Sequence, residues 1–287
     1  MPQTINTNLA SLNAQRNLSS SQSSLATSMQ RLSSGMRVNS AKDDAAGLAI
    51  AERMTSQVRG MNAAIRNAND GISLSQTAEG ALGKVSDMLQ RMREISVQAA
   101  SSTNSTTDRT SLDAEYQQLA SEASRTLGGT KFNGQSILAT TDNSTYQVGA
   151  GTSATLDQIS VAAFDWTSVA AITTAVGAAV GTAPTTSLAG TDGSFATASI
   201  TALDAAIDSI NSQRATYGAV QNRFDSVISN LQVAVENQSA ARSRIMDTDF
   251  AAETSNLSRA QILQQAGNAM VAQANQLPQQ VMKLLQG

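Results

Sequence analysis

The stretch VRGMNAAIRNANDGISLSQTAEGALGKVSDMLQRMREISVQA, residues 58–99, decides the fold class. Small or apolar side chains recur along it at steps of three and four, the spacing that one face of an α-helix requires. They are Val58, Met61, Ile65, Ala68, Ile72, Ser75, Ala78, Leu82, Val85, Leu89, Met92, Ile95 and Ala99. This length predicts a helical rod of roughly 60 Å, because an α-helix rises about 1.5 Å per residue.

Two further helical patterns follow. One runs through residues 203–245 and matches the first in length, and a shorter one through residues 112–127 ends at Gly128-Gly129. Two long helices from opposite halves of a chain favour a bundle that pairs those halves. The predicted fold is therefore mostly α, a long helical bundle or coiled coil formed by the N- and C-terminal halves.

The middle of the chain shows turn and strand signals instead of helical spacing. Asn133-Gly134 is a strong turn signal, and TYQVGA and LDQISVAAF alternate as short strands do, which predicts a small β-hairpin region at about residues 131–161. Residues 161–199 are rich in Ala, Thr, Gly and Ser, and form either a small, loosely packed excursion or a flexible loop. The large side chains available as anchors there are Phe164, Trp166 and Phe195.

The composition excludes several functions. The chain has no histidine and no cysteine, so the commonest general base, the commonest metal ligands and the thiol nucleophile are all missing. We therefore expect no enzyme, no cofactor and no metal. A net charge of -3 and 3% aromatic residues argue against nucleic-acid binding.

No apolar run approaches the ~18–20 residues that cross a bilayer, and MPQTINTNLASLNAQ lacks the features of a cleavable secretory signal.

Both ends of the chain are almost free of charge. Residues 1–30 contain only Arg16, and residues 260–287 contain only Lys283. Each end nevertheless carries apolar side chains at helical spacing: Ile5, Leu9, Leu12, Leu25, Met29 and Leu32, and Leu263, Ala266, Met270, Leu277, Val281 and Leu284. Such weak, uncharged amphipathic segments predict helices that form only when packed on several sides, by partners from more than one subunit.

Long motifs at both ends resemble bacterial flagellin. They are INTNLASLNAQRNL, RLSSGMRVNSAKDDAAGLAIAERM, RNANDGISLSQTAEGAL and LQRMREISVQAA, then GAVQNRFDSVISNL and AQILQQAGNAMVAQANQLPQQV. The resemblance covers roughly residues 1–160 and 200–287. It implies a subunit that is exported unfolded, is located outside the cell and polymerises with itself into the flagellar filament for motility. The implied partners are an export chaperone, the filament cap and the hook–filament junction proteins.

The resemblance also implies a domain organisation. Residues 1–40 and 248–287 would pair as a coiled coil that lines the filament core, with Leu263, Ala266 and Met270 buried partly on the N-terminal helix. Residues 41–160 and 200–247 would form the helical rod, and residues 161–199 a short variable surface segment. Val271 would meet adjacent subunits.

LQRMREISVQ resembles the flagellin segment that an animal Toll-like receptor binds, and the same face would contact a neighbouring protofilament. The implied residues are Leu89, Gln90, Arg91, Arg93, Glu94, Gln98 and Glu115. At about 100° per residue, Arg91, Glu94 and Gln98 point away from Leu89 and from the bundle core. The alternative interpretation is a solvated Arg91–Glu94 pair.

Other interpretations stay open. A hook–filament junction protein shares the terminal helices, but it would not polymerise alone into long filaments. A secreted membrane-active translocator would need a long apolar hairpin and would make liposomes leak. Asp43-Asp44 and Asp247/Asp249 could be catalytic carboxylate pairs, but ion pairing with Lys42, Arg242 and Arg244 is the favoured prediction.

Overall fold

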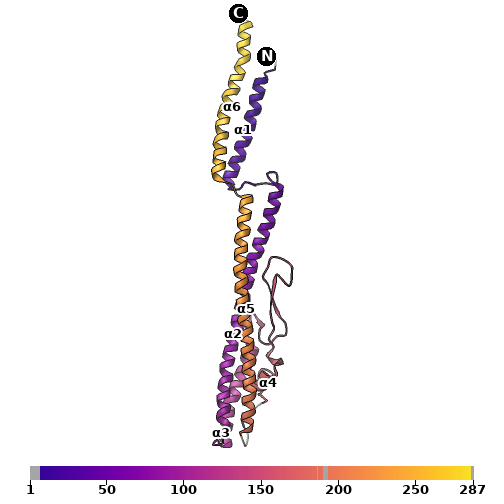
Figure 1. Ribbon diagram of the computed structural model, residues 1–287, viewed down its shortest axis with the longest axis vertical. Helices are drawn as coiled ribbons and strands as arrows, with labels where there is room; N and C mark the ends of the chain where they lie inside the picture. The colour runs from indigo at the N-terminus through magenta and orange to yellow at the C-terminus, as the bar shows by residue number, and fades with distance from the viewer. Residues whose placement is uncertain (1–6, 186, 190–192, 286–287) are drawn as a thin grey trace. The chain divides into compact units, whose positions relative to one another are not determined.

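A computed structural model describes residues 7–185, 187–189 and 193–285, with backbone only for residues 277–285 (Figure 1). The helices are α1 (Leu9–Ser34), α2 (Ala45–Ala99), α3 (Thr106–Gly129), the short 3-10 helix η1 (Trp166–Ser168), α4 (Ala170–Val176), α5 (Ser194–Met246) and α6 (Phe250–Leu285). The strands are β1 (Lys131–Phe132), β2 (Gln135–Ser136), β3 (Ser144–Gln147) and β4 (Gln158–Val161). The predicted fold class, mostly α with a small β region, is confirmed. Within the described part of the chain, no helix is long and apolar enough to cross a membrane.

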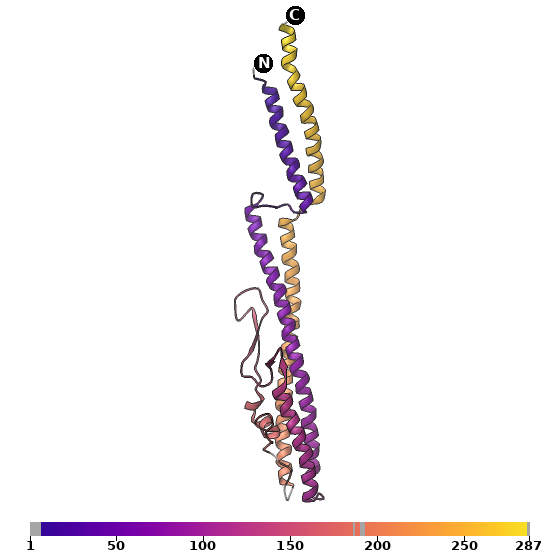
Figure 2. The same cartoon turned by 180° about the vertical axis from the view of Figure 1, so that it is seen from behind.

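The chain folds into two compact units, each built from both halves of the sequence. The terminal unit comprises Met1–Gln57 and Glu236–Gly287, and the central unit comprises Val58–Val235. In the terminal unit α1 lies beside α6, as the two opposite views show (Figures 1 and 2).

The core of the central unit is the predicted helical stripe. From Leu82 to Ala99, every stripe residue of α2 is at most 1% exposed. This face meets buried side chains of the two other long helices of the unit, namely Tyr116, Ala120 and Leu127 from α3 and Leu203, Ile210, Tyr217 and Phe224 from α5. A helix that is hydrophobic on one side gains most of its stability by burying that side. The packing of this face therefore stabilises α2 despite the glycines in its interior.

Polar groups define the turn between α2 and α3. Ser105 caps α3 and exchanges hydrogen bonds with Asp108, a complete capping box. Arg109 is 5% exposed and donates from Nε to the carbonyl oxygen of Ala99 at 3.0 Å. A cation is favourable at a helix C-terminus, so this buried arginine stabilises the end of α2.

The β region consists of two small antiparallel sheets. Strands β1 and β2 join through Asn133-Gly134, where both residues have positive φ, 49° and 81°, as a tight hairpin turn requires. Strands β3 and β4 pair from Ser144 to Val161. The second hairpin is attached to α2, because Asn67 Nδ2 donates to the carbonyl oxygen of Gln147 at 3.0 Å.

The described part of residues 161–199 is a packed excursion and contains η1 and α4. Phe164 and Trp166 are buried as expected, whereas Phe195 is 53% exposed and does not anchor the segment. Asp113 of α3 holds the chain instead, since its carboxylate accepts from the backbone N–H of Leu188 at 2.6 Å and from the Ser187 hydroxyl at 3.1 Å.

Gly71 and Gly80 of α2 provide a matched pair of substitutions. A Cβ at Gly71 would lie 2.6 Å from the Phe224 ring, whereas nothing lies within 4 Å of a Cβ at Gly80. We expect Gly71→Ala to destabilise the central unit by about 1–3 kcal/mol through overpacking. Gly80→Ala should stabilise it by about 0.5–1 kcal/mol through helix propensity. Denaturant unfolding of the two variants measures both effects, and equal stabilities would contradict the close α2–α5 approach.

Candidate subunit interface and recognition face

The terminal helices contact each other along one line of side chains, which we call the seam. Buried and half-buried positions recur in both helices at alternating steps of three and four, the pattern of a coiled coil. The seam positions are Ser11, Ala14, Leu18, Ser21, Leu25, Ser28 and Leu32 of α1, and Glu253, Leu257, Ala260, Gln264, Gly267, Val271 and Ala274 of α6.

Specific contacts show that the two helices run antiparallel. At one end of the seam the Ser11 hydroxyl donates to Asn275 Oδ1 at 2.8 Å. In its middle, a Cβ built on Gly267 would lie 3.1 Å from Leu18 Cδ1. At the other end Arg31 Nη1 is 3.9 Å from Glu253 Oε2. Small residues in α6 therefore allow α1 to approach closely.

The predicted packing stripe of α6 is not the face that meets α1. Leu263 and Met270 keep 50% and 63% of their surface exposed, and Ala266 is exposed as well. The seam uses Gln264, Gly267 and Val271, each one residue further along the chain. Val271, which we expected to meet other subunits, is thus half-buried within the subunit. The reason is that small side chains, rather than the largest apolar ones, set the closest approach of two backbones.

The predicted α1 residues divide in the same way. Leu25 and Leu32 are half-buried in the seam, whereas Leu9, Leu12 and Met29 are 69%, 51% and 57% exposed. Ile5 lies outside the described residues. Leu277, Val281 and Leu284 lie on α6, in the part described by backbone only.

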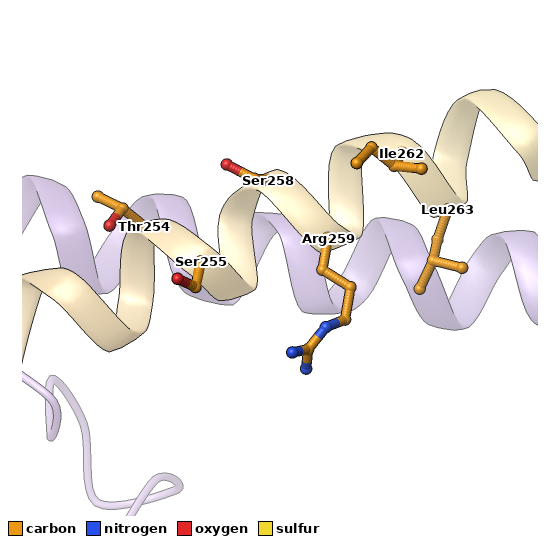
Figure 3. Close-up of a pocket in the computed structure, with 6 residues that line it drawn as sticks. All are labelled: Thr254, Ser255, Ser258, Arg259, Ile262 and Leu263. Atoms are coloured by element: carbon orange, nitrogen blue, oxygen red, sulfur yellow. The ribbon is translucent and has the colours of Figure 1, made fainter.

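Beside the seam, Leu263, Ala266 and Met270 line an open groove of about 400 Å³ together with Ala10, Ala14 and Leu18 of α1. A second hollow on α6 is lined by Thr254, Ser255, Ser258, Arg259, Ile262 and Leu263. Figure 3 shows Arg259 and Leu263 on the same side of this helix. The terminal helices thus present large apolar side chains to solvent.

The predicted recognition residues lie on the exposed sides of α2 and α3, apart from Leu89. Gln90, Arg91, Arg93, Glu94 and Gln98 are all exposed, as is Glu115 of α3. Leu89 is 0% exposed, so it belongs to the core and is not part of this exposed face. Its helical spacing makes Leu89 a member of the apolar stripe of α2.

Arg91 is the centre of an ion-pair network between α2 and α3. Its Nη1 donates to Glu94 Oε2 at 3.0 Å, and its Nη2 donates to Glu115 Oε1 at 2.9 Å. These two hydrogen bonds, the one to Glu94 first, raise the pKa of Arg91. The sequence suggested the Arg91–Glu94 pair, and the structure adds Glu115 as a second partner that fixes the guanidinium plane.

Asp204 is a member of this surface that the sequence did not indicate. Arg93 Nε donates to Asp204 Oδ1 at 2.6 Å, and this hydrogen bond lowers the pKa of the Asp204 carboxyl. The two residues are 111 positions apart, so only the pairing of α2 with α5 brings them together.

The acidic residues near the linkers cap backbone groups. Asp43 accepts from the hydroxyl and the backbone N–H of Ser40, and these bonds lower its pKa. Asp44 accepts from Gly47 N–H, and Asp249 accepts from Ala251 and Ala252 N–H at the start of α6. The predicted ion pairs with Lys42, Arg242 and Arg244 are wrong for the described residues. A short aspartate side chain reaches the free N–H groups of a helix start more easily than a distant cation.

Comparison with known proteins gives the family. Residues 5–143 match the model of the bacterial flagellin N-terminal helical region, and residues 200–285 match that of the C-terminal helical region. The flagellin of Halalkalibacterium halodurans is 45% identical over 282 residues, 98% of this chain and 99% of that protein. The flagellin of Bacillus subtilis is 42% identical over 304 residues, again 98% and 99%. A crystal structure of Bacillus cereus flagellin has 38% identity and a TM-score of 0.49, and covers 58% of this chain and 88% of that one.

The long paired helices with their exposed apolar faces define a structural, self-associating protein. The chain belongs to the bacterial flagellin family. It is a structural subunit of the flagellar filament, it polymerises with itself, and it functions in motility outside the cell. The family is one of structural proteins and not of enzymes.

Proposed function

We propose that the outward faces of α1 and α6 carry the contacts between subunits that build the filament. The supporting observation is the set of large apolar side chains on these helices that are at least half exposed. They are Leu9, Leu12, Met29, Phe250, Ile262, Leu263 and Met270. Exposed apolar surface on this scale is typical of an interaction site. A second copy of the same chain offers matching faces, and repeated head-to-tail contacts generate a helical polymer.

The domain organisation inferred from the sequence is part of this proposal. Residues 1–40 and 248–287 enter the filament core, residues 41–160 and 200–247 form the surrounding rod, and residues 161–199 lie on its surface. The scarcity of charge toward both ends, with only Arg16 in residues 1–30 and only Lys283 in residues 260–287, supports the first assignment, because burying an isolated charge is costly.

The export chaperone, the filament cap and the hook–filament junction proteins are proposed partners. They rest on family membership. The alternatives of a junction protein and of a membrane-active translocator are not favoured, because the relatives that match along nearly the whole chain are flagellins.

Electron microscopy of the purified chain in solution tests the assembly proposal. We expect long filaments without any other protein. Short capped oligomers, or no assembly under conditions in which a related flagellin polymerises, would exclude it.

We further propose that Gln90, Arg91, Arg93, Glu94, Gln98 and Glu115 form the face that a flagellin-sensing Toll-like receptor binds on the free subunit. The same face packs against a neighbouring protofilament in the filament. Its support is the exposure of all six residues and the position of Arg91, which two carboxylates hold in place. Arginine is common among interface residues with large energetic effects.

Arg91→Ala tests the recognition proposal. We expect receptor signalling by the monomer to fall about thirtyfold, as for loss of an interface hot spot worth about 2 kcal/mol, and motility to be impaired. Helical content, measured by circular dichroism, should not change because Arg91 is outside the core. Arg125→Ala is the control, since Arg125 forms a similar exposed pair with Glu122 on α3. If the Arg91 variant signals and swims like the Arg125 variant, Arg91 is only a solvated charge.

A further inference from the structure

Pro278 interrupts the backbone hydrogen bonding of α6 near its end. Of the three prolines in the chain, Pro2, Pro184 and Pro278, it is the one that lies inside a described helix. A proline has no backbone N–H, so it cannot donate to the carbonyl oxygen four residues earlier, as every other residue type does in a helix interior. In α6 the carbonyl that loses its helical donor in this way belongs to Ala274.

Asn8 supplies the missing donor from the other terminal helix. Its Nδ2 donates to the Ala274 carbonyl oxygen at 2.7 Å. Ala274 lies in the seam with 7% of its surface exposed, so water has little access to it, and a buried carbonyl without a donor is costly. The two residues are 266 positions apart. The bond therefore exists only when the start of α1 lies against the later part of α6.

The same side chain begins α1. Asn8 is the N-cap residue of this helix, and its Oδ1 accepts from the Ser11 backbone N–H at 3.1 Å. The two partners fix the orientation of the amide, because the N–H needs an acceptor and the carbonyl needs a donor. Serine, threonine and aspartate also cap helices well, but none of them carries an amide donor beside its capping oxygen. An asparagine at this position thus serves both helices at once.

This bond does not select the alignment of the two helices. At the linker end of the seam, backbone hydrogen bonds such as that from Thr248 N–H to the Gly35 carbonyl, at 3.0 Å, already align them. The Asn8 bond lies at the opposite end, next to the bond from Ser11 to Asn275. Helix ends fray most easily, so a bond there closes the part of the seam that opens first.

We propose that Asn8 and Pro278 act as a pair that makes the later part of α6 depend on α1. The proline removes one hydrogen bond from within α6, and Asn8 replaces it with a bond that forms only on docking. Asn8 is then a positioning residue for assembly, because it completes the helix that carries the exposed Met270 and the residues after Pro278. This inference rests on the proposed role of the terminal helices in the filament.

A double-mutant cycle tests the pair, with the critical concentration for polymerisation as the measured quantity. Asn8→Ser keeps a capping oxygen of similar quality but removes the amide donor. It should raise the critical concentration about fivefold, as loss of a hydrogen bond worth about 1 kcal/mol does. Pro278→Ala restores an N–H that can donate to the Ala274 carbonyl. In that background Asn8→Ser should change the critical concentration by no more than about twofold, since the carbonyl keeps a donor.

Two further variants separate this effect from helix capping and from unrelated effects on α1. Asn8→Ala removes the cap together with the donor, so it should weaken assembly with or without Pro278→Ala. Asn13→Ser changes an exposed asparagine of α1. Whatever its own effect on the critical concentration, that effect should be the same with and without Pro278→Ala.

Equal effects of Asn8→Ser in the two backgrounds would show that Asn8 and Pro278 act independently, and would overturn the proposal. No effect in the otherwise unchanged chain would do the same. If Asn8→Ser prevents assembly altogether, Pro278→Ala should restore it.

Should Pro278→Ala alone prevent assembly, solid-state NMR of filaments of the unmodified chain decides. A through-space contact between the Asn8 side-chain nitrogen and the Ala274 carbonyl carbon is expected, and its absence would exclude the bond. Failure of the unmodified chain to form filaments would instead count against the proposed function. The two failures are therefore distinguishable.

Discussion

Leu263→Asp is expected to abolish filament formation while leaving the central unit folded. Leu263 is half exposed in the subunit and lies beside the seam, so an aspartate is tolerated there before assembly. In the filament, the proposed contact would bury the new carboxylate without a partner, at a cost of several kcal/mol per subunit. Because every subunit repeats the fault, the polymer as a whole is destabilised. Sedimentation and electron microscopy measure the assembled fraction.

Leu156→Asp is the matched control for this prediction. Leu156 is 83% exposed in the β3–β4 connection of the central unit, outside the terminal helices. The same change of side chain there should leave polymerisation intact. Normal filaments from the Leu263 variant would show that this face of α6 stays in water and would refute the packing proposal. Leu277→Asp is expected to behave like Leu263→Asp.

Trypsin should remove both ends of the free subunit rapidly and leave them intact in filaments. The physical reason is the composition of the seam, since serine, alanine and glycine bury little apolar surface when α1 packs on α6. About the first 35 and last 40 residues should therefore become stably helical only on polymerisation. Cleavage is expected after Arg16, Arg31 and Arg259. If assembly stabilises these helices by about 3 kcal/mol, cleavage slows by about a hundredfold.

Internal sites provide the control for the proteolysis experiment. Arg66 and Lys84 lie within α2 in the central unit, whose buried core stabilises that helix in both states. They should resist cleavage in subunit and filament alike. Mass spectrometry of the products over time identifies each site. Equal cleavage rates at Arg16 and Arg259 in the two states would exclude coupling of terminal folding to assembly.

Much of the fold can be predicted from local sequence patterns. The stripe from Leu82 to Ala99 predicted the buried face of α2, because helical periodicity depends only on spacing along the chain. Asn133-Gly134 predicted the β1–β2 turn, because positive φ at two successive residues favours this pair. The exposure of Arg91, Glu94 and Gln98 followed from the same helical geometry.

Contacts between distant segments could not be predicted in this way. The pairing of Arg93 with Asp204 and the capture of Leu188 by Asp113 depend on which helices become neighbours. Neither leaves a periodic signal, since one polar side chain on a solvated helix face resembles any other.

The seam between α1 and α6 shows most clearly what the sequence determined and what it left open. The sequence by itself determined that both ends are weakly charged amphipathic helices. On α6, however, large apolar residues at Leu263 and Met270 and small ones at Ala260 and Gly267 both have helical spacing. Only the tertiary structure decided between these two stripes. The small stripe faces α1 because two helix backbones approach most closely where side chains are shortest, which leaves the large apolar stripe on the surface of the subunit.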